Sequence, residues 1–452
     1  MHKPFLLKVV GIFSLIMLMT WAISYINGII LERQQRNEQV KYDIAKSFAG
    51  EQTLIGPILV VPYTEEYLTS TIENGVSKTE LKRETHAAYF MPEQLEVAGG
   101  FSNEYKKLGI YKALMYQLGG QVKGKFNLPA NLGITPTQQN GKLTFQPAYI
   151  SLGISDPRGI AQKPTFSFNH QQYAFVQGSQ VKALGNGIHA QVENLHQTHA
   201  QSIPFELTLN LHGMEKLHFA PVAEDNNIHL KSSWQHPHFN GSFLPQHTTG
   251  KQGFDAKWSV SSLASNNQAL LKNSLETNTM PVLESLTIGF VEPINVYSQA
   301  DRATKYGLLF IGLTFVGFYL FEILKQLRIH PAQYTLVGLS MAMFYLLLIS
   351  FAEHIGFASA YLLASSACVL LLGYYLSYVL HSKLNGFIFA SLLTALYGAL
   401  YGILASEDNA LLMGAILVFG LLSLTMIITR RIDWYQISQK NASYEQQQYD
   451  VV

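Results

Sequence analysis

Three things are scarce in this chain, and each scarcity excludes a class of function. One cysteine occurs among 452 residues, so no disulfide can form within the chain. The formal net charge is +1, which gives no electrostatic reason to expect a nucleic acid as partner. No Gly-x-Ser-x-Gly turn, His-Glu-x-x-His helix or phosphate-binding loop is present. We therefore expect a non-enzyme with no catalytic, cofactor-binding or metal-binding residue.

Long apolar runs are abundant instead, and they fill the last third of the chain. Each run reaches the roughly 20 helical residues that cross the 30 Å hydrocarbon core of a bilayer. The runs cover about 306–324, 333–352, 357–380, 386–404 and 410–429. The single cysteine, Cys368, lies inside the third run, where we expect a buried and inert thiol. The sequence predicts an α-helical membrane block at 301–431.

A further apolar run, 9–30, follows Lys3 and Lys8 near the amino terminus. It is longer than the apolar region of a cleaved signal peptide, and Ala22-Ile23-Ser24 is only a weak cleavage signal. We therefore prefer an uncleaved membrane anchor to a signal peptide. Together with the five later runs it gives six transmembrane helices.

The charges of the loops predict the orientation. Loops rich in Lys and Arg mark the cytoplasmic side, and basic loops alternate here with loops that lack them. This pattern places both termini in the cytoplasm and residues 32–300 outside the membrane. The expected divisions are 1–31 for the amino terminus and first helix, 32–50 for a stalk, 51–300 for an exported domain, 301–431 for the five-helix block and 432–452 for a cytoplasmic tail.

The stalk has its apolar residues at helical spacing. Val40, Ile44, Ala45 and Phe48 share one face, and Gly50 follows them. We expect an amphipathic helix, continuous with the anchor, that packs on the exported domain. A helix lying on the membrane surface is the alternative.

The exported domain alternates apolar and polar residues with a period of two. The clearest example is the run from Ile203 to Leu211, and similar runs occur at 143–145, 166–168, 228–234 and 254–260. Such alternation is typical of strands with one buried face. Fourteen of the sixteen prolines lie between Pro57 and Pro293, which favours many turns. We predict an all-β, sandwich-like antiparallel domain inserted between the first and second transmembrane helices.

Histidines gather in this domain, and a zinc or copper site is one interpretation of them. The candidates are His196, His199, His229, His236 and His238. A zinc site needs three or four converging ligands, usually with cysteine or carboxylate among them. The period of two places His229 on the polar face of a strand, and His236-Pro237-His238 is typical of a turn. We therefore favour solvated or structural histidines.

Two features of the membrane block are candidate sites. One is a stripe of small residues at every fourth position of one helix: Gly386, Ala390, Thr394, Gly398 and Gly402. Such a stripe allows close helix packing, within the bundle or, as the alternative, between two copies of the chain. The other is a polar cluster expected at the outer face: Glu353, His354, Glu407 and Asp408. Glu322, near the inner end of its helix, is one turn from Lys325 and is explained by that pair.

Several segments resemble one family of membrane proteins. In the membrane block they are DRATKYGLLFI at 301–311, FE at 321–322, HPAQY at 330–334, FYLLL at 344–348, EH at 353–354, YG at 397–398 and 401–402, ED at 407–408 and TRRIDWY at 429–435. In the exported part they are LIGP at 54–57 and SWQHPHFNGSFLP at 233–245. Together these segments resemble the CreD family of inner-membrane proteins.

The resemblance implies a function in the cell envelope. It implies a Gram-negative inner-membrane protein that maintains envelope integrity, regulated by the CreB/CreC two-component system and linked to tolerance of colicins and β-lactams. We expect the lipid bilayer and an unidentified periplasmic or inner-membrane protein as partners, with a homo-oligomer as a further option. The alternative is a transporter or lipid-handling protein gated by the exported domain. No proline follows Pro331, so the proline-broken helices of many transporters are not indicated.

Overall fold

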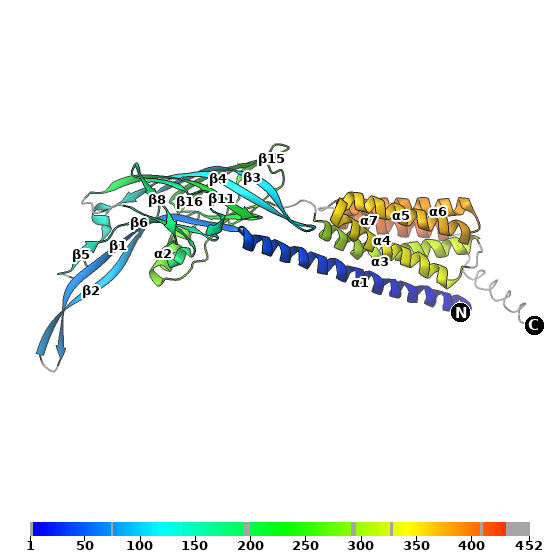
Figure 1. Cartoon of the computed structure of the whole chain (residues 1–452). Coiled ribbons are helices and arrows are strands. Elements are labelled where there is room, and N and C mark those ends of the chain that lie inside the picture. The colour runs from blue at the N-terminus through cyan, green and yellow to red at the C-terminus, as the bar shows by residue number, and fades with distance from the viewer. Residues whose placement is uncertain are drawn as a thin grey trace, which may run out of the picture. The chain divides into compact units, whose positions relative to one another are not determined.

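The computed structural model describes residues 3–73, 76–138, 140–192, 195, 199–290, 295–325, 329–406 and 410–430. The chain divides into two compact units. One comprises Asn37–Pro293, and the other comprises Met1–Arg36 with Ile294–Val452. Helix α1 (Lys3–Ser47) is a single helix of 45 residues that belongs partly to each unit (Figure 1).

Long apolar helices build the second unit, which we call the membrane unit. After α1 they are α3 (Val296–Lys325), α4 (Pro331–Ile355), α5 (Phe357–Val379), α6 (Lys383–Ala405) and α7 (Ala410–Thr429). In the described part of the chain, five of them, α1 and α3 to α6, are long and apolar enough to cross a bilayer. The apolar stretch of α7, Leu412–Ile427, is shorter than the apolar stretches of these five helices. The structure therefore supports five of the six expected spans.

Local signals in the sequence explain where α4 begins. The ring Nδ1 of His330 accepts a hydrogen bond from the backbone N–H of Ala332, and the Gln333 side chain accepts one from the backbone N–H of His330. This reciprocal arrangement is a capping box, and Pro331 occupies the first helical position, where its missing N–H costs nothing. Inside the unit, large aromatic rings are fully buried: Phe310, Phe315, Phe318, Tyr334 and Phe344.

Two β-sheets build the other unit, which we call the β domain. The first sheet runs in the order β14 (Pro237–Gly241), β17 (Leu286–Phe290), β12 (Lys216–Ala220), β1 (Gln52–Glu73), β6 (Tyr149–Ile154), β10 (Gly187–Gln191) and β9 (Val176–Gln177), and β2 (Val76–Phe90) and β5 (Lys142–Phe145) also pair with β1. The second runs in the order β15 (Gln246–Gly250), β16 (Gly253–Ser261), β13 (Asp225–Ser232), β3 (Gln94–Leu108), β4 (Tyr111–Leu128), β11 (Gln201–Met214), β7 (Thr165–Phe168) and β8 (Gln171–Ala174).

The alternating runs of the sequence are strands in the structure, as predicted. Residues 203–211 lie in β11, and their apolar members are buried while their polar neighbours are not. Residues 143–145, 166–168 and 254–260 lie in β5, β7 and β16. The run at 228–234 is shorter than expected, because β13 ends at Ser232. Pro237 and His238, expected in a turn, begin strand β14.

The antiparallel, all-β expectation needs correction, because both sheets are mixed. β1 pairs with β12 in parallel, and β3 pairs with β13 in parallel. Helix α2 (Asn267–Thr277) also belongs to the domain. The period of two reports which face of a strand is buried, and it carries no information about the direction of the neighbouring strand. Parallel neighbours need long connections, and these strands are far apart in the sequence.

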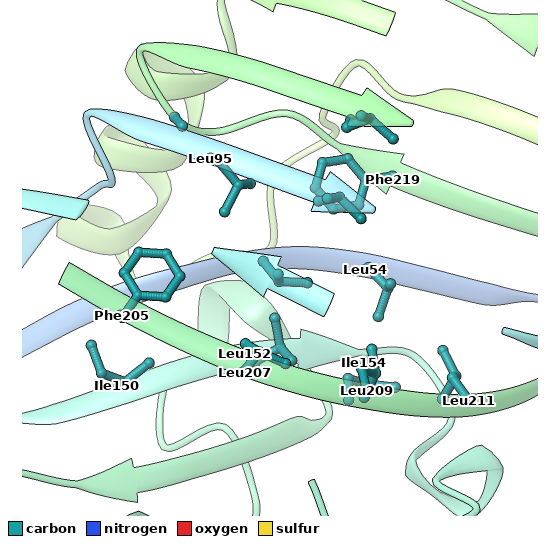
Figure 2. Close-up of a cluster of buried hydrophobic side chains, with 14 of the residues drawn as sticks. Leu54, Leu95, Ile150, Leu152, Ile154, Phe205, Leu207, Leu209, Leu211 and Phe219 are labelled. Carbon is teal, nitrogen blue, oxygen red and sulfur yellow. The ribbon is translucent and has the colours of Figure 1, made fainter. Parts of the chain in front are cut away.

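The two sheets share one hydrophobic core. Phe101 of β3 and Tyr116 of β4 lie in the second sheet, and their rings contact Phe290 of β17 in the first, with centroids 4.9 Å and 5.1 Å apart. Figure 2 shows part of this core. Leu95 and Phe205 of the second sheet and Phe219 of the first sheet belong to the same buried cluster. Burial on facing sides of both sheets is the arrangement of a sandwich.

The last turns of α1 pack on the β domain. Ile44 forms a small buried cluster with Ala113, Met115 and Met214, and Val40 and Ala45 lie against it. Val40, Ile44 and Ala45 are residues of the amphipathic pattern, whereas the fourth, Phe48, is 49 % exposed. Hydrophobic contact of one helix face therefore attaches α1 to the domain.

A charged pair completes the end of α1. The guanidinium of Arg158 donates hydrogen bonds to the carbonyl oxygens of Lys46 and, at 3.5 Å, Ala45. These carbonyls have no partner within the helix, so the cation satisfies them and interacts favourably with the negative end of the helix dipole. Asp156 holds Arg158 through Nη2–Oδ2 at 2.6 Å and accepts a hydrogen bond from the N–H of Gly50. We call Asp156 and Arg158 the α1 clamp.

Candidate functional site

A carboxylate, a cation and a hydroxyl meet in the membrane unit. Glu353, near the end of α4, has a side chain that is only 8 % exposed. Its Oε1 accepts a hydrogen bond of 3.2 Å from the hydroxyl of Tyr297, and its Oε2 lies 4.0 Å from Nη1 of Arg33. The three residues come from α4, α3 and α1. The contact therefore joins three helices at one end of the unit.

This cluster differs from the polar cluster that the sequence suggested. His354, the neighbour of Glu353, is exposed. Glu407 and Asp408 lie outside the described residues, so the expected meeting of the four side chains is not tested. Sequence reasoning missed Arg33 and Tyr297, because partners on helices far apart in the chain have no common pattern.

A second buried carboxylate lies near the other end of α3. Glu322 is 5 % exposed, and its Oε2 accepts a 2.8 Å hydrogen bond from the hydroxyl of Tyr334 on α4. Its Oε1 lies 3.3 Å from the backbone N–H of Ile329, which donates to it. The sequence explained Glu322 by Lys325 alone, whereas the structure adds these two donors from the next segment. Buried charges need such donors, because desolvation penalises the charged form.

The stripe of small residues has two different surroundings along α6. At Gly386, an added Cβ would lie 2.7 Å from the Cα of Ser377 on α5, so the two helices touch there. Ala390 lies close to Gly373 of α5, where a Cβ would come within 3.0 Å of the Ala390 Cβ. At Gly398 and Gly402 an added Cβ would meet nothing within 4 Å among the described residues. The first half of the stripe thus serves contact between α5 and α6, and the second half borders open space.

That open space is a groove of about 710 Å³ between α5 and α6. Gly398 and Thr394 line it on α6, and Leu362 and Leu370, 69 % and 73 % exposed, line it on α5. Hydroxyl groups are frequent in its wall, and they come from Ser359, Tyr361, Ser365, Ser366, Tyr397 and Tyr401. A groove with apolar rims and scattered hydroxyl groups can hold an acyl chain and offer hydrogen bonds to its polar end. We call it the α5–α6 groove.

Behind the groove, a chain of hydrogen bonds fixes the tyrosines. The hydroxyl of Tyr361 donates to the carbonyl oxygen of Tyr397 at 2.7 Å. The hydroxyl of Tyr397 donates to the sulfur of Cys368 at 3.2 Å. The thiol in turn lies 3.6 Å from the carbonyl oxygen of Ser340, to which it donates. Cys368 is 4 % exposed and serves as a polar link between α4, α5 and α6.

The histidines of the β domain do not gather into one site in the described part of the chain. No group of three His, Cys, Asp or Glu side chains lies close enough there to hold a metal ion. His229 contacts Asp255, with Nε2 and Oδ1 2.8 Å apart, and Lys231 lies 3.0 Å from the other carboxylate oxygen. His196 lies outside the described residues. The neighbours of His229 are therefore the Asp255 carboxylate and the Lys231 ammonium group, which form an ion pair on the surface of the sheet.

Comparison with known proteins identifies the family. The profile described as "Inner membrane protein CreD" matches residues 4–435. The chain belongs to the CreD family. Inner membrane protein CreD of Escherichia coli K12 is 32 % identical over 439 residues, which cover 97 % of this chain and 95 % of that protein. The family is one of inner-membrane proteins, in agreement with the several apolar helices, so this member is a multi-pass inner-membrane protein.

The likeness to one solved structure carries no information about the fold. A mutant M1 zinc metallopeptidase from Deinococcus radiodurans, bound to a Tyr-Ser-Ala peptide, aligns with 44 % of this chain and 42 % of its own at 9 % identity. The TM-score of 0.21 is too low to support an argument.

Proposed function

We propose that this member of the CreD family maintains cell-envelope integrity under stress without acting as an enzyme. The match over residues 4–435 is the observation that supports the proposal. By the resemblance given above, the stresses include colicins and β-lactams, and the CreB/CreC system controls the gene. In this proposal the β domain binds a protein partner, and the membrane unit anchors it.

The proposed topology has six spans. Helix α7 (Ala410–Thr429), with 20 residues, is the sixth, since about 20 helical residues suffice to cross the hydrocarbon core. Basic residues mark the cytoplasmic loops, so both termini are cytoplasmic and the β domain is periplasmic. In this orientation the cluster of Arg33, Tyr297 and Glu353 lies at the periplasmic face, and Glu322 lies toward the cytoplasm.

The β1–β2 hairpin is the element of the β domain best suited to a partner. The two strands pair from Leu59–Phe90 out to Glu73–Val76, whereas β5 accompanies β1 only as far as Glu66. Beyond that point a two-stranded arm extends from the domain (Figure 1). Leu68 and Leu81 lie opposite each other on the arm and are 61 % and 57 % exposed. An exposed apolar pair on a protruding ribbon offers both contact area and free strand edges to a partner.

A complementation experiment tests this function. The gene is deleted in the native host, and the cells are challenged with a detergent and a β-lactam. The full chain is then restored either unchanged, with Leu68→Ser and Leu81→Ser, or with Leu263→Ser as a matched control. Leu263 lies in the same domain and is 98 % exposed, so its replacement makes the same chemical change on the surface away from the arm. We expect rescue by the unchanged chain and the control, and loss of rescue by the arm variant. Failure of the unchanged chain to rescue contradicts the proposed function.

The α5–α6 groove favours a second candidate function, lipid handling. In a bilayer, a groove of about 710 Å³ with exposed apolar rims is filled by acyl chains. Gly398 lines the groove, and a Cβ at this position would meet nothing within 4 Å, so the Gly398→Phe side chain would fill part of the groove. If the chain moves or presents lipid, this variant should lose lipid transfer between vesicles, and the wild type should show it. If neither form transfers lipid, the lipid-handling function is rejected and the groove is left as a packing feature.

A further inference from the structure

The tip of the β3–β4 hairpin carries an unusual combination of exposed residues. Leu108 is 52 % exposed, Ile110 is 45 % exposed and Tyr105 is 41 % exposed. Strand β3 ends at Leu108 and pairs with Tyr111 of β4, so Gly109 and Ile110 form the turn. Leaving three apolar side chains of one hairpin tip in water is unfavourable, so we expect the tip to contact another apolar surface.

The geometry of the turn does not account for the isoleucine. Gly109 has φ +63°, a conformation that glycine adopts without steric cost and that short hairpin turns often require. The second turn position makes no such demand on Ile110, and polar residues are common in exposed turns. The apolar choice at this position therefore points to a contact outside the domain.

Lysines flank the apolar tip along the chain. Lys106, Lys107 and Lys112 lie within seven positions, with Glu104 as the acidic neighbour, so the segment 104–112 has three positive charges and one negative charge. Lys106 contacts that carboxylate, with Nζ and Oε1 3.0 Å apart. Lys112 Nζ lies 4.6 Å from the ring centroid of Tyr105. Apolar side chains flanked by lysines are the combination that binds an anionic lipid surface.

The hairpin lies at the end of the domain where α1 attaches. Ala113 and Met115, at the start of β4, form the cluster with Ile44 of α1. Lys106 Nζ also lies 5.0 Å from the ring centroid of Phe48, which directly follows α1. The β1–β2 arm leaves the domain at the other end, because β1 begins beside α1 at Gln52 and reaches the arm only at its far end (Figure 1).

The continuous helix α1 sets how far its attachment to the β domain lies from its apolar run. Ile44 follows Ile30, the end of the apolar run, by 14 residues of one continuous helix, which is about 21 Å of helix axis. From Ala113 to Ile110 a strand covers roughly 10 Å. The polar headgroup layer adds about 5–7 Å outside the hydrocarbon core. The remaining distance along α1 between the headgroup layer and Ile44 is therefore about 15 Å, which is of the same order as the reach of the hairpin beyond Ala113.

We propose that the β3–β4 tip inserts Leu108 and Ile110 into the interface of an anionic bilayer, with Lys106, Lys107 and Lys112 on the lipid phosphates. This contact holds the β domain to the membrane at a second point besides α1. It does not depend on the partner of the β1–β2 arm or on the envelope function proposed above.

Fluorescence of the full-length protein in vesicles tests the proposal. Cys368 is replaced by alanine, and Ile110→Cys is labelled with the environment-sensitive dye nitrobenzoxadiazole. Val282→Cys is the matched control, because Val282 is 92 % exposed in the same domain. The vesicles contain either equal parts of phosphatidylglycerol and phosphatidylcholine or phosphatidylcholine alone. Nitroxide-labelled lipids report direct contact between dye and bilayer by quenching.

We expect blue-shifted emission and nitroxide quenching at position 110 in the anionic vesicles, and water-like emission at position 282 in both. Replacing Lys106, Lys107 and Lys112 by glutamine should weaken docking about fivefold per lysine. Water-like emission at position 110 in the anionic vesicles overturns the proposal. A blue shift without lipid quenching also overturns it, because the tip then contacts protein. Equal quenching in phosphatidylcholine, unaffected by the lysine changes, overturns the choice of an anionic surface.

Discussion

The hydroxyl of Tyr334 donates a 2.8 Å hydrogen bond to the carboxylate of Glu322, and the two side chains are 1 % and 5 % exposed. Tyr334 also packs against Phe315 and Phe318, with ring centroids 5.7 Å and 4.7 Å away. The relationship thus combines a polar contact with an aromatic core. It connects α3 and α4 at a place where the sequence suggests only the pair of Glu322 with Lys325.

The Tyr334→Phe variant should lower the free energy of unfolding by about 1–3 kcal/mol, because a buried carboxylate loses a donor while the aromatic packing stays. Thermal unfolding of the purified full-length protein in detergent measures the change. Tyr374→Phe is the control, since Tyr374 is 68 % exposed and its replacement should leave the unfolding temperature unchanged. Equal stability of the Tyr334 variant and the wild type would show that the hydrogen bond contributes nothing.

Glu353 should tolerate glutamine and not leucine. Its ion pair with Arg33 is long, at 4.0 Å, and the Arg33 side chain is 48 % exposed, so the loss of charge should cost less than about 1 kcal/mol. An amide oxygen can still accept the hydrogen bond from Tyr297. Glu353→Leu removes that acceptor and should cost about 1–3 kcal/mol more. The same unfolding measurement compares the two variants, and equal costs would contradict the importance of the Tyr297 contact.

Two glycines of the same helix should respond in opposite ways to alanine. Gly386→Ala places a methyl group 2.7 Å from the Cα of Ser377 and should cost about 1–3 kcal/mol through overpacking. Gly398→Ala meets nothing within 4 Å and should be neutral or stabilise the helix by up to about 1 kcal/mol. Unfolding temperatures of the two variants, each a single added methyl group on α6, provide the comparison. A greater loss from Gly398→Ala would refute the division of the stripe into two halves.

The α1 clamp should make the β domain sensitive to acid. Hydrogen bonds from Arg158 hold the pKa of Asp156 below its ordinary value of 3.8, and the backbone N–H of Gly50 adds to this effect against the opposing effect of burial. A lowered pKa in the folded state contributes stability above the ordinary pKa, and that contribution is lost as the pH falls below 3.8 toward the folded-state value.

Asp156→Asn should therefore destabilise the protein by roughly 1 kcal/mol at neutral pH and by progressively less below the ordinary pKa. Unfolding followed by tryptophan fluorescence at neutral pH and at several acidic pH values tests this. Asp43→Asn, on the exposed side of α1, serves as the control for an added amide. A stability difference that does not change between neutral and acidic pH would contradict the clamp.

The apolar runs and the buried faces of strands are the features that short sequence patterns indicate most directly. The apolar run at 333–352 lies within a helix that the structure extends to Pro331–Ile355, because the cap at His330 adds residues that apolar length does not mark. The alternation from Ile203 to Leu211 marked the buried face of β11, because successive side chains of a strand point to opposite sides. Both signals need only a few neighbouring residues.

The candidate sites were only partly visible in the same way. The stripe was predicted as a packing surface, and two of its residues, Thr394 and Gly398, line the α5–α6 groove, whose other wall comes from α5 residues such as Ser365. Glu353 was singled out by its charge, while Arg33 lies 320 positions earlier in the chain. A contact between distant helices has no signature in either helix alone.

The sequence by itself determined the membrane block, the strand-rich domain and the family, because apolar length, alternation and matching segments are properties of the chain in order. Only the tertiary structure decided that β1 lies parallel to β12, that α5 and α6 touch at Gly386 and leave a groove beside Gly398, and that Glu322 meets Tyr334. Hydrophobic periodicity states which face of an element is buried. Which element covers that face depends on packing among segments far apart in the sequence, and a single sequence does not record it.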